Sequence, residues 1–221
     1  MDTLKYMSIS YTIRQKIKEF AACDSGLVFV EFAMSFFVLL ILFAASLELT
    51  RYVLIVQNME KTASTIVTSV SQIDPTKITT GASVTSIIDA TLAAVPSMMS
   101  PYGTKPTETI MISDVFYNAT PPVSTTVRWQ YCGGGTLSGV SSKIGKAGGS
   151  ADLSQFSGFS IINPTDPTSN QEILVTEIYY KYNPILANLG FIGISVPLYR
   201  SSLFSLNPAL GSTTPAGSPC P

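Results

Sequence analysis

The sequence contains no histidine, and this absence narrows the chemistry open to the chain. Without imidazole, serine-histidine-aspartate triads, histidine-based acid/base catalysis and nearly all zinc sites that use histidine are excluded. Charge is also scarce, since only 12% of the 221 residues are charged and the formal net charge is -1. Such a chain offers no basic surface to a nucleic-acid backbone. We therefore expect no nucleic-acid partner and no cofactor, and no cluster of the remaining reactive side chains points to an enzyme.

What the chain does contain is one long apolar run, from Leu27 to Leu47. As a helix this run would be about 31 Å long, which is enough to cross the hydrocarbon core of a bilayer. The alternative, a buried core helix, is uncommon for apolar runs of this length. Cations are more frequent before the run than directly after it: Lys5, Arg14, Lys16 and Lys18 against Arg51 and Lys61. This bias predicts a cytoplasmic N-terminus, with the bulk of the chain outside the cytoplasm.

A charged, polar segment precedes the apolar run and ends at Gly26. A secretory signal has its apolar core before the cleavage site, whereas here the polar segment comes first. A lipoprotein signal at Cys23 also fails, because no apolar core precedes this cysteine. The run itself carries one carboxylate, Glu31, near its start. A carboxylate in hydrocarbon is costly enough to indicate a function.

The segment DSGLVFVEFAMSFFVLLILFAASLELTR, residues 24–51, resembles a known processing signal. A polar leader that ends in Gly26, an apolar helix that begins at Leu27, and Glu31 five residues beyond the glycine are similar to the processing site of type IV prepilins. More narrowly, the core Val-Glu-Phe-Ala at 30–33 resembles the N-terminal signature of the TadE-like proteins of tight-adherence (Tad/Flp) pilus systems. The resemblance covers residues 20–73, and beyond them it is limited to VTEIYYKYNPIL and VPLYRSS.

This resemblance implies a minor pilin or pseudopilin with a pilin-like fold, cut after Gly26 by a prepilin peptidase. It implies roles in processing and assembly for Glu31 and Phe32. The partners it implies are that peptidase, the major Flp pilin, a sister pseudopilin, the inner-membrane pilus platform and the membrane. The protein would lie in the bacterial inner membrane with a periplasmic C-terminal domain, or be incorporated in the extracellular pilus. The alternative is an unprocessed single-span envelope protein whose outer domain binds a surface ligand.

The position of Glu31 also has a physical interpretation. Cleavage after Gly26 leaves an α-amino group on Leu27, a cation with an ordinary pKa of about 8. A carboxylate one helical turn along can neutralise this amine, on its own chain or on a neighbour, and so offset the desolvation of both groups. Alternatively, Glu31 reaches the lipid headgroups, because it lies only one turn into the helix.

Beyond the apolar run, apolar residues continue at helical spacing and form one stripe: Tyr52, Val56, Met59, Ala63, Ile66, Val70 and Ile73. The pair Asp74-Pro75 ends this pattern, since the residue before a proline is disfavoured in a helix. We therefore expect a leader at 1–26, a transmembrane segment at 27–47, a helical continuation at 48–74 and a periplasmic domain at 75–221. The stripe packs either against this domain or against a neighbouring helix.

The domain is expected to be α+β. A helix at 81–95 would be stopped by Pro96, and strands are expected at 107–118, 123–132, 172–182 and within 194–204. Strict alternation in the second strand puts four side chains on one face: Val123, Val127, Trp129 and Tyr131. In the third, Leu174, Ile178, Tyr180 and Tyr182 share a face. These patterns predict a small antiparallel sheet with one polar face, covered on its apolar face by the long helix.

The Gly/Ser-rich segment 133–158 is expected to be a flexible surface loop. It does not match a P-loop, because its glycine spacing is one residue too long and Ala147 stands where a magnesium-binding hydroxyl is needed.

The three cysteines divide between two compartments in this topology. Cys23 lies in the leader and would be removed by cleavage, while Cys132 and Cys220 lie in an oxidising compartment. We predict a Cys132–Cys220 disulfide that ties the Pro/Ser-rich C-terminal tail to the second strand. The alternative is two unpaired thiols.

Overall fold

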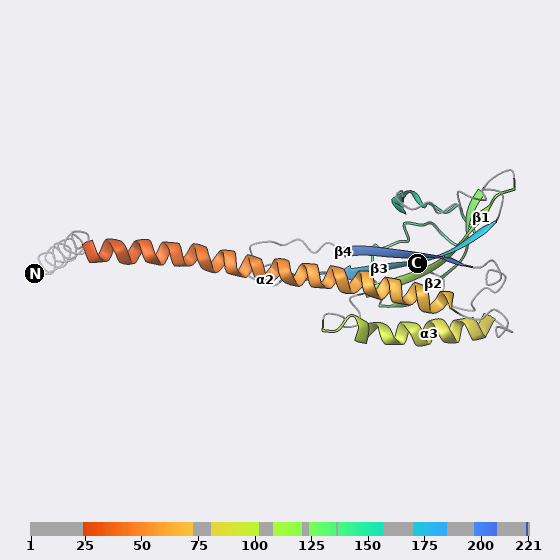
Figure 1. Ribbon diagram of the computed structural model, residues 1–221, viewed down its shortest axis with the longest axis horizontal. Helices are drawn as coiled ribbons and strands as arrows, with labels where there is room; N and C mark the ends of the chain where they lie inside the picture. Colours follow the sequence, from red (N-terminus) through yellow and green to blue (C-terminus); the bar gives the residue numbers. More distant parts are fainter. Residues whose placement is uncertain are drawn as a thin grey trace, which may run out of the picture. The chain divides into compact units, whose positions relative to one another are not determined.

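The computed structural model describes residues 24–72, 81–101, 108–120, 124–135, 137–156, 170–184, 197–206 and 220. Its helices are α2 (Asp24–Ser71) and α3 (Gly81–Met98), with a 3-10 turn η2 (Ser154–Phe156); its strands are β1 (Glu108–Asn118), β2 (Ser124–Gly134), β3 (Gln171–Lys181) and β4 (Pro197–Leu206) (Figure 1). A long apolar N-terminal helix is thus followed by a four-stranded antiparallel sheet. The predicted α+β fold is confirmed.

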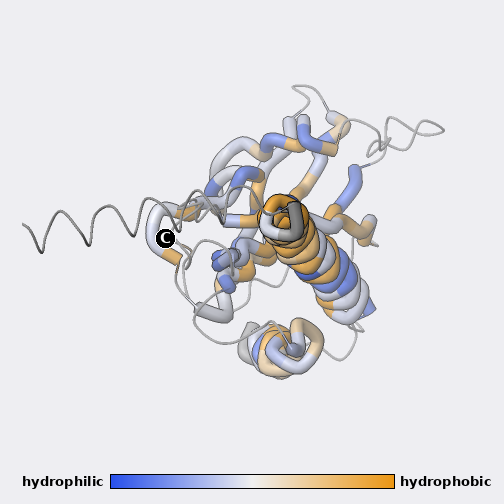
Figure 2. The backbone as a smooth tube through the Cα atoms, turned by 90° about the vertical axis from the view of Figure 1, so that its left-hand side faces the viewer, coloured by the Kyte–Doolittle hydropathy of each residue, from blue (hydrophilic) through white to orange (hydrophobic). Residues whose placement is uncertain are grey.

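Contacts divide the chain into two units, Met1–Thr50 and Arg51–Pro221. Helix α2 runs continuously from one into the other. It begins at Asp24, three residues before the predicted start, and ends at Ser71, three residues before the predicted end at 74. In the first unit the large apolar side chains from Leu27 to Leu49 are all exposed. Figure 2 shows the change along α2 from continuous hydrophobic colouring to a mixed pattern. The helix is long and apolar enough to cross a membrane.

In the second unit, α2 and α3 cover one face of the sheet. Helix α2 contributes a buried stripe that begins at Ile55 and continues through Met59, Ala63, Ile66, Val67 and Val70. Helix α3 adds Val84, Ile88, Leu92 and Val95, and the sheet adds residues such as Ile110, Trp129, Tyr131, Leu174 and Ile178. The stripe of α2 therefore packs against the chain's own domain, one of the two predicted uses. Of the predicted stripe, Tyr52 is exposed and Val56 only half-buried, so the first buried residue is Ile55; Ile73 lies outside the described residues.

The strands lie in the order β2-β1-β3-β4, each antiparallel to its neighbour. All four predicted strands are present, and no boundary is shifted by more than three residues. The third strand's predicted face is confirmed, since its four residues lie together in the helix-side core. In β2 the strict alternation is wrong, because a bulge sets Asp114 opposite Trp129 but Val115 opposite Val127. The extra residue, Arg128, turns Val127 to the other face.

The second face of the sheet is not an open polar surface. Residues 137–156 cover it, and Ile144 is fully buried there against Val115, Val127, Ile173 and Val175. This segment also pairs with the edge strand, since the N–H groups of Val127 and Gly148 donate to the carbonyls of Gly149 (2.9 Å) and Val127 (2.7 Å). The prediction of a flexible surface loop is therefore wrong for this part of 133–158. We call residues 137–156 the covering segment.

Helix α3 does not stop before Pro96 but continues to Met98. A proline so close to a helix end removes only one backbone hydrogen bond. The next turn is retained, because the N–H of Met99 donates to the Val95 carbonyl at 2.9 Å and both side chains are buried.

Candidate functional site

The predicted processing residues lie in the first turns of α2. The Gly26–Leu27 peptide bond is inside the helix, which begins at Asp24. The side chain of Leu27 is 71% exposed, and Glu31 is also exposed. Because residues four apart share a helix face, Glu31 lies on the same face as Leu27 and about 6 Å further along the axis. This spacing lets the carboxylate reach a group at position 27 of its own chain or of a neighbouring helix.

Phe32 is the other residue assigned to assembly. Its side chain is 66% exposed. Its ring stacks on that of Phe36, with centroids 6.1 Å apart and planes at 16°. The two rings form an apolar surface one turn long, directly after Glu31. Contact with lipid or with another apolar helix would remove this surface from water, which is favourable.

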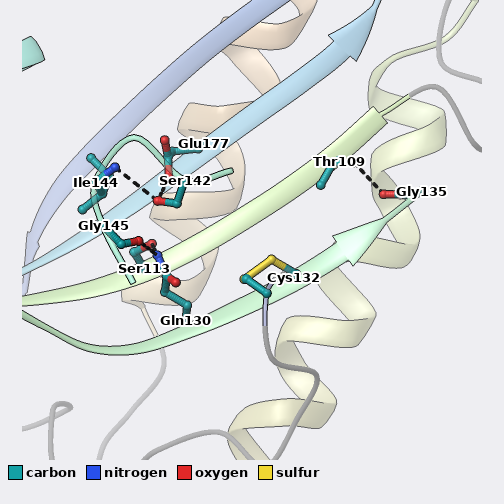
Figure 3. The surroundings of a disulfide bond; sticks show 10 residues. Thr109, Ser113, Gln130, Cys132, Gly135, Ser142, Ile144, Gly145 and Glu177 are labelled. Atoms are coloured by element: carbon teal, nitrogen blue, oxygen red, sulfur yellow. Dashed lines mark hydrogen bonds between the residues drawn. A yellow bond between two sulfur atoms is a disulfide. The ribbon is translucent and has the colours of Figure 1, made fainter. Parts of the chain in front are cut away.

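Cys132 and Cys220 form a disulfide, with Cα atoms 5.2 Å apart across 88 residues of sequence (Figure 3). The predicted pairing is thus confirmed, and the two-thiol alternative is wrong. In the chain-entropy account, closing a loop of this length stabilises the folded state by about 4–5 kcal/mol. The bond fixes Cys220 to β2. Cys23 lies outside the described residues.

A buried carboxylate that the sequence did not indicate holds the covering segment in place. Glu177, on β3, accepts hydrogen bonds from the hydroxyl of Ser142, from the N–H of Lys143 (2.9 Å) and from the hydroxyl of Tyr199 (3.1 Å). Figure 3 shows Ser142 and Ile144 of the segment beside Glu177. Hydrogen bonds from several donors offset the loss of water around such a buried carboxyl group.

Two tyrosines complete this network. Burial, followed by the charge of Glu177, raises the pKa of Tyr179, and burial also raises the pKa of Tyr199. Both hydroxyls therefore stay protonated. That of Tyr179 donates to the Ser141 carbonyl (2.8 Å), and that of Tyr199 lies 2.8 Å from the Gln155 side-chain oxygen as well as near Glu177, so its single proton can go to one of the two. The network fastens the segment to the sheet through donors that do not titrate near neutral pH. The role of the network is therefore structural: it holds the covering segment on β3 and β4.

A second buried carboxyl, Asp114, lies on the helix side of the sheet close to Glu172. Burial, followed by the charge of Glu172, raises the pKa of Asp114 to about 8. Arg128, the bulge residue, lies 3.6 Å from Glu172 (Nη1 to Oε1), and its guanidinium carbon is 3.8 Å from the ring centroid of Phe116. Both carboxyls are at most 1% exposed, so they are out of reach of a substrate in this structure. Instead, because the pKa of Asp114 is raised in the folded chain, folding of the second unit is accompanied by uptake of a proton at Asp114 at neutral pH.

A half-open cleft of about 200 Å³ lies between α3 and the ends of β1 and β2. Asp89 contributes an exposed carboxylate; the buried Glu108 also lines the cleft, and Leu92, Pro96 and Gly133 contribute apolar walls. The hydroxyl of Tyr131 donates to Asp89, and this hydrogen bond raises the pKa of Tyr131 to about 12. Within the residues that the structure describes, no group of three or more His, Cys, Asp and Glu side chains could hold a metal ion.

Comparison of this chain with protein-family models, with curated proteins and with solved structures gave no match. Its function must therefore be inferred from the arrangement of its own residues, above all those at the start of α2.

Proposed function

We propose that the chain is a minor pilin or pseudopilin, a TadE-like component that takes part in the assembly of a Tad/Flp-type adhesive pilus. One observation carries this proposal. Gly26 lies in the first turn of a helix, Glu31 lies one turn beyond Leu27 on the same face, and a long, exposed apolar helix follows. This combination fits a prepilin processing site at the head of a membrane anchor.

In this proposal α2 crosses the inner membrane with its start at the cytoplasmic side. The exposed apolar surface of the first unit supports the crossing, since burial in lipid removes it from water. The excess of cations before the span supports the orientation. The disulfide supports an oxidising compartment for the second unit, because such bonds persist in the periplasm and are rare in the cytosol.

Processing requires the Gly26–Leu27 bond to leave the helix before a prepilin peptidase can cut it. Glycine lowers helix stability by about 1 kcal/mol relative to alanine, and helix ends fray. A glycine in the first turn of α2 therefore keeps the cost of local opening small.

After cleavage, the new amine on Leu27 and the carboxylate of Glu31 would both lie at the edge of the hydrocarbon. Each offsets the desolvation of the other, within one chain or between this chain and a neighbouring pilin helix. Partner helices would come from the major Flp pilin or a sister pseudopilin, assembled on the inner-membrane platform. Phe32 and Phe36 offer these helices an exposed apolar surface.

The variant Glu31→Ala tests this role, with Glu60→Ala as the matched control because Glu60 is an exposed carboxylate on the same helix. Removing one partner of a buried ion pair costs about 3–5 kcal/mol, so we expect Glu31→Ala to abolish nearly all pili. Glu60→Ala should leave pilus counts unchanged. The fluorescence of Trp129, in the core of the second unit, should show that both variants fold. Normal pilus counts in Glu31→Ala would support the alternative that Glu31 only reaches the headgroups.

A second candidate function is an unprocessed, single-span envelope protein that binds a surface ligand. The cleft beside Asp89 favours it, since this is a concave site with an exposed carboxylate and apolar walls on the second unit. Retention of residues 1–26 in the membrane, together with loss of ligand binding in Asp89→Asn, would support this candidate over the pilin.

A further inference from the structure

The cleft between α3 and the ends of β1 and β2 has its space because of Gly133. Alternate residues of a strand share a face, so Gly133 follows Trp129 and Tyr131 on the helix side of the sheet. A Cβ added at Gly133 would collide with Cδ1 of Leu92. The glycine thus lets α3 lie close to β2, and it leaves bare backbone where a side chain would otherwise fill the cleft.

Asp89 supplies the exposed charge of this cleft. It is the single charged residue in the sequence of α3, and its side chain is exposed. Glu108, which also lines the cleft, is only 1% exposed. Among the described residues that line the cleft, none is Lys or Arg. An anionic ligand would therefore meet a negative charge that no cation of the cleft offsets.

Tyr131 fixes one oxygen of this carboxylate and leaves the other open. Its hydroxyl donates to Oδ1 of Asp89 at 2.5 Å, and this hydrogen bond raises the pKa of Tyr131 to about 12. Tyr131 therefore remains a neutral donor at physiological pH. In the part of the chain that the structure describes, the carboxylate of Asp89 accepts no other hydrogen bond and forms no ion pair. Its Oδ2 is thus available to a donor from outside the chain.

We infer that the cleft binds the side chain of a lysine residue of a partner protein. The ammonium group donates to Oδ2 of Asp89, and the four-carbon stem lies against the apolar walls formed by Leu92 and Pro96. A half-open cleft of about 200 Å³ admits one such side chain and leaves the rest of the partner outside.

Lysine fits this site better than arginine does. Arginine binds a carboxylate most strongly through both of its oxygens, and one oxygen of Asp89 already accepts a hydrogen bond from Tyr131. An ammonium is a compact charge that needs only one oxygen. The inference concerns the second unit alone, so it does not depend on processing at Gly26, and it names the ligand class of the cleft for either function proposed above.

Saturation-transfer NMR on the full-length protein in nanodiscs tests the inference. The probe is N-acetyl-lysine methylamide, which presents the lysine side chain and no other charge. The neutral comparison is N-acetyl-norleucine methylamide, which has the same four-carbon stem without the ammonium. After subtraction of the signal from empty nanodiscs, the lysine probe should bind about tenfold more tightly, the equivalent of one hydrogen bond between charged groups.

Two pairs of variants locate the binding. Asp89→Asn keeps the size of the side chain and an acceptor for Tyr131, but it should weaken binding of the lysine probe about tenfold. Asp152→Asn, at an exposed carboxylate of the covering segment, should leave binding unchanged. Ala93→Phe should abolish binding, because Ala93 lines the cleft and a phenyl ring there would occupy it. Ala90→Phe, at an exposed position of α3 outside the cleft lining, should have no effect.

The fluorescence of Trp129 shows that each variant folds, so loss of binding can be assigned to the cleft. Equal binding of the lysine and norleucine probes, or wild-type affinity in both Asp89→Asn and Ala93→Phe, would overturn the inference. Tighter binding of butylamine, a free amine with the same stem, would assign the cleft to a small soluble amine and overturn the protein partner. None of these outcomes bears on processing at Gly26, which the N-terminal sequence measures separately.

Discussion

Replacing Asp114 by asparagine should change how the stability of the second unit depends on pH. Asp114 is fully buried beside Glu172, and burial together with that neighbouring charge raises its pKa to about 8. In the folded chain Asp114 therefore keeps a proton that the unfolded chain loses near pH 4. Asparagine has the same shape as the protonated acid, carries no charge and can still donate a hydrogen bond to Glu172.

The sign of the effect follows from linkage. A carboxyl whose folded-state pKa lies above its unfolded value contributes stability that is fully present below about pH 4 and is lost as the pH rises toward 8. Between these limits the loss is at most about 1.4 kcal/mol per pH unit. From pH 5 to pH 7 the free energy of unfolding should therefore fall by up to about 2–3 kcal/mol through this group. Asp114→Asn should remove this fall, and its free energy of unfolding at pH 7 should be higher than that of the wild type.

Urea unfolding in nanodiscs, followed by Trp129 fluorescence, measures this directly. Trp129 is the chain's single tryptophan, and it is 7% exposed. The matched control is Asp152→Asn, because hydrogen bonds from Ser154 lower the pKa of Asp152 and place its titration below this pH window. A wild type whose stability is flat from pH 5 to pH 7, or an Asp114→Asn variant that keeps the wild-type slope, would refute the reasoning.

Three further predictions, all measured by urea unfolding, concern the covering segment, the disulfide and the core. Gly145→Ala should lower the free energy of unfolding by about 3 kcal/mol, and Gly139→Ala should lower it by about 1 kcal/mol. Both glycines have a positive φ (129° and 79°), but only at Gly145 would an added Cβ meet a backbone atom, at 2.6 Å. Cys220→Ser should lower stability by up to about 4–5 kcal/mol, and reductant should then have no further effect on it. Ile66→Ala should cost about 2–5 kcal/mol through the cavity it leaves, while the exposed Thr65→Ala should change stability by less than about 0.5. Equal losses of stability in Gly145→Ala and Gly139→Ala would contradict the conclusion that the covering segment is held rigidly on the sheet.

Much of the fold could be predicted because it depends on local pattern. Strands β1 to β4 are runs of residues with high β-propensity, and these runs become the strands of the sheet with only small shifts at their ends. The stripe of α2 is likewise visible in its spacing, although packing decides that Ile55 rather than Val56 is its first buried member. The disulfide could be predicted because only Cys132 and Cys220 follow the span.

The rest depends on contacts between residues far apart in sequence. Alternation in β2 fails at Arg128, because a bulge is set by pairing with β1 rather than by β2 itself. The covering segment has the composition of a flexible loop, and a single apolar residue such as Ile144 carries no periodic signal. The covering segment is held in place by Glu177, which accepts a hydrogen bond from Ser142, 35 residues away in the sequence. At the start of α2, the structure adds that Gly26 lies within the helix. The amine proposed to pair with Glu31 would be created only by cleavage, so its position cannot be read from the uncut chain.

The central claim is that the chain is processed as a prepilin. The most direct test is the N-terminal sequence and intact mass of the membrane-extracted protein, made with and without its cognate prepilin peptidase. We predict a mature chain that begins at Leu27 and is present only with the peptidase. A chain that keeps residues 1–26 in both cases would contradict the account and favour the single-span binding protein.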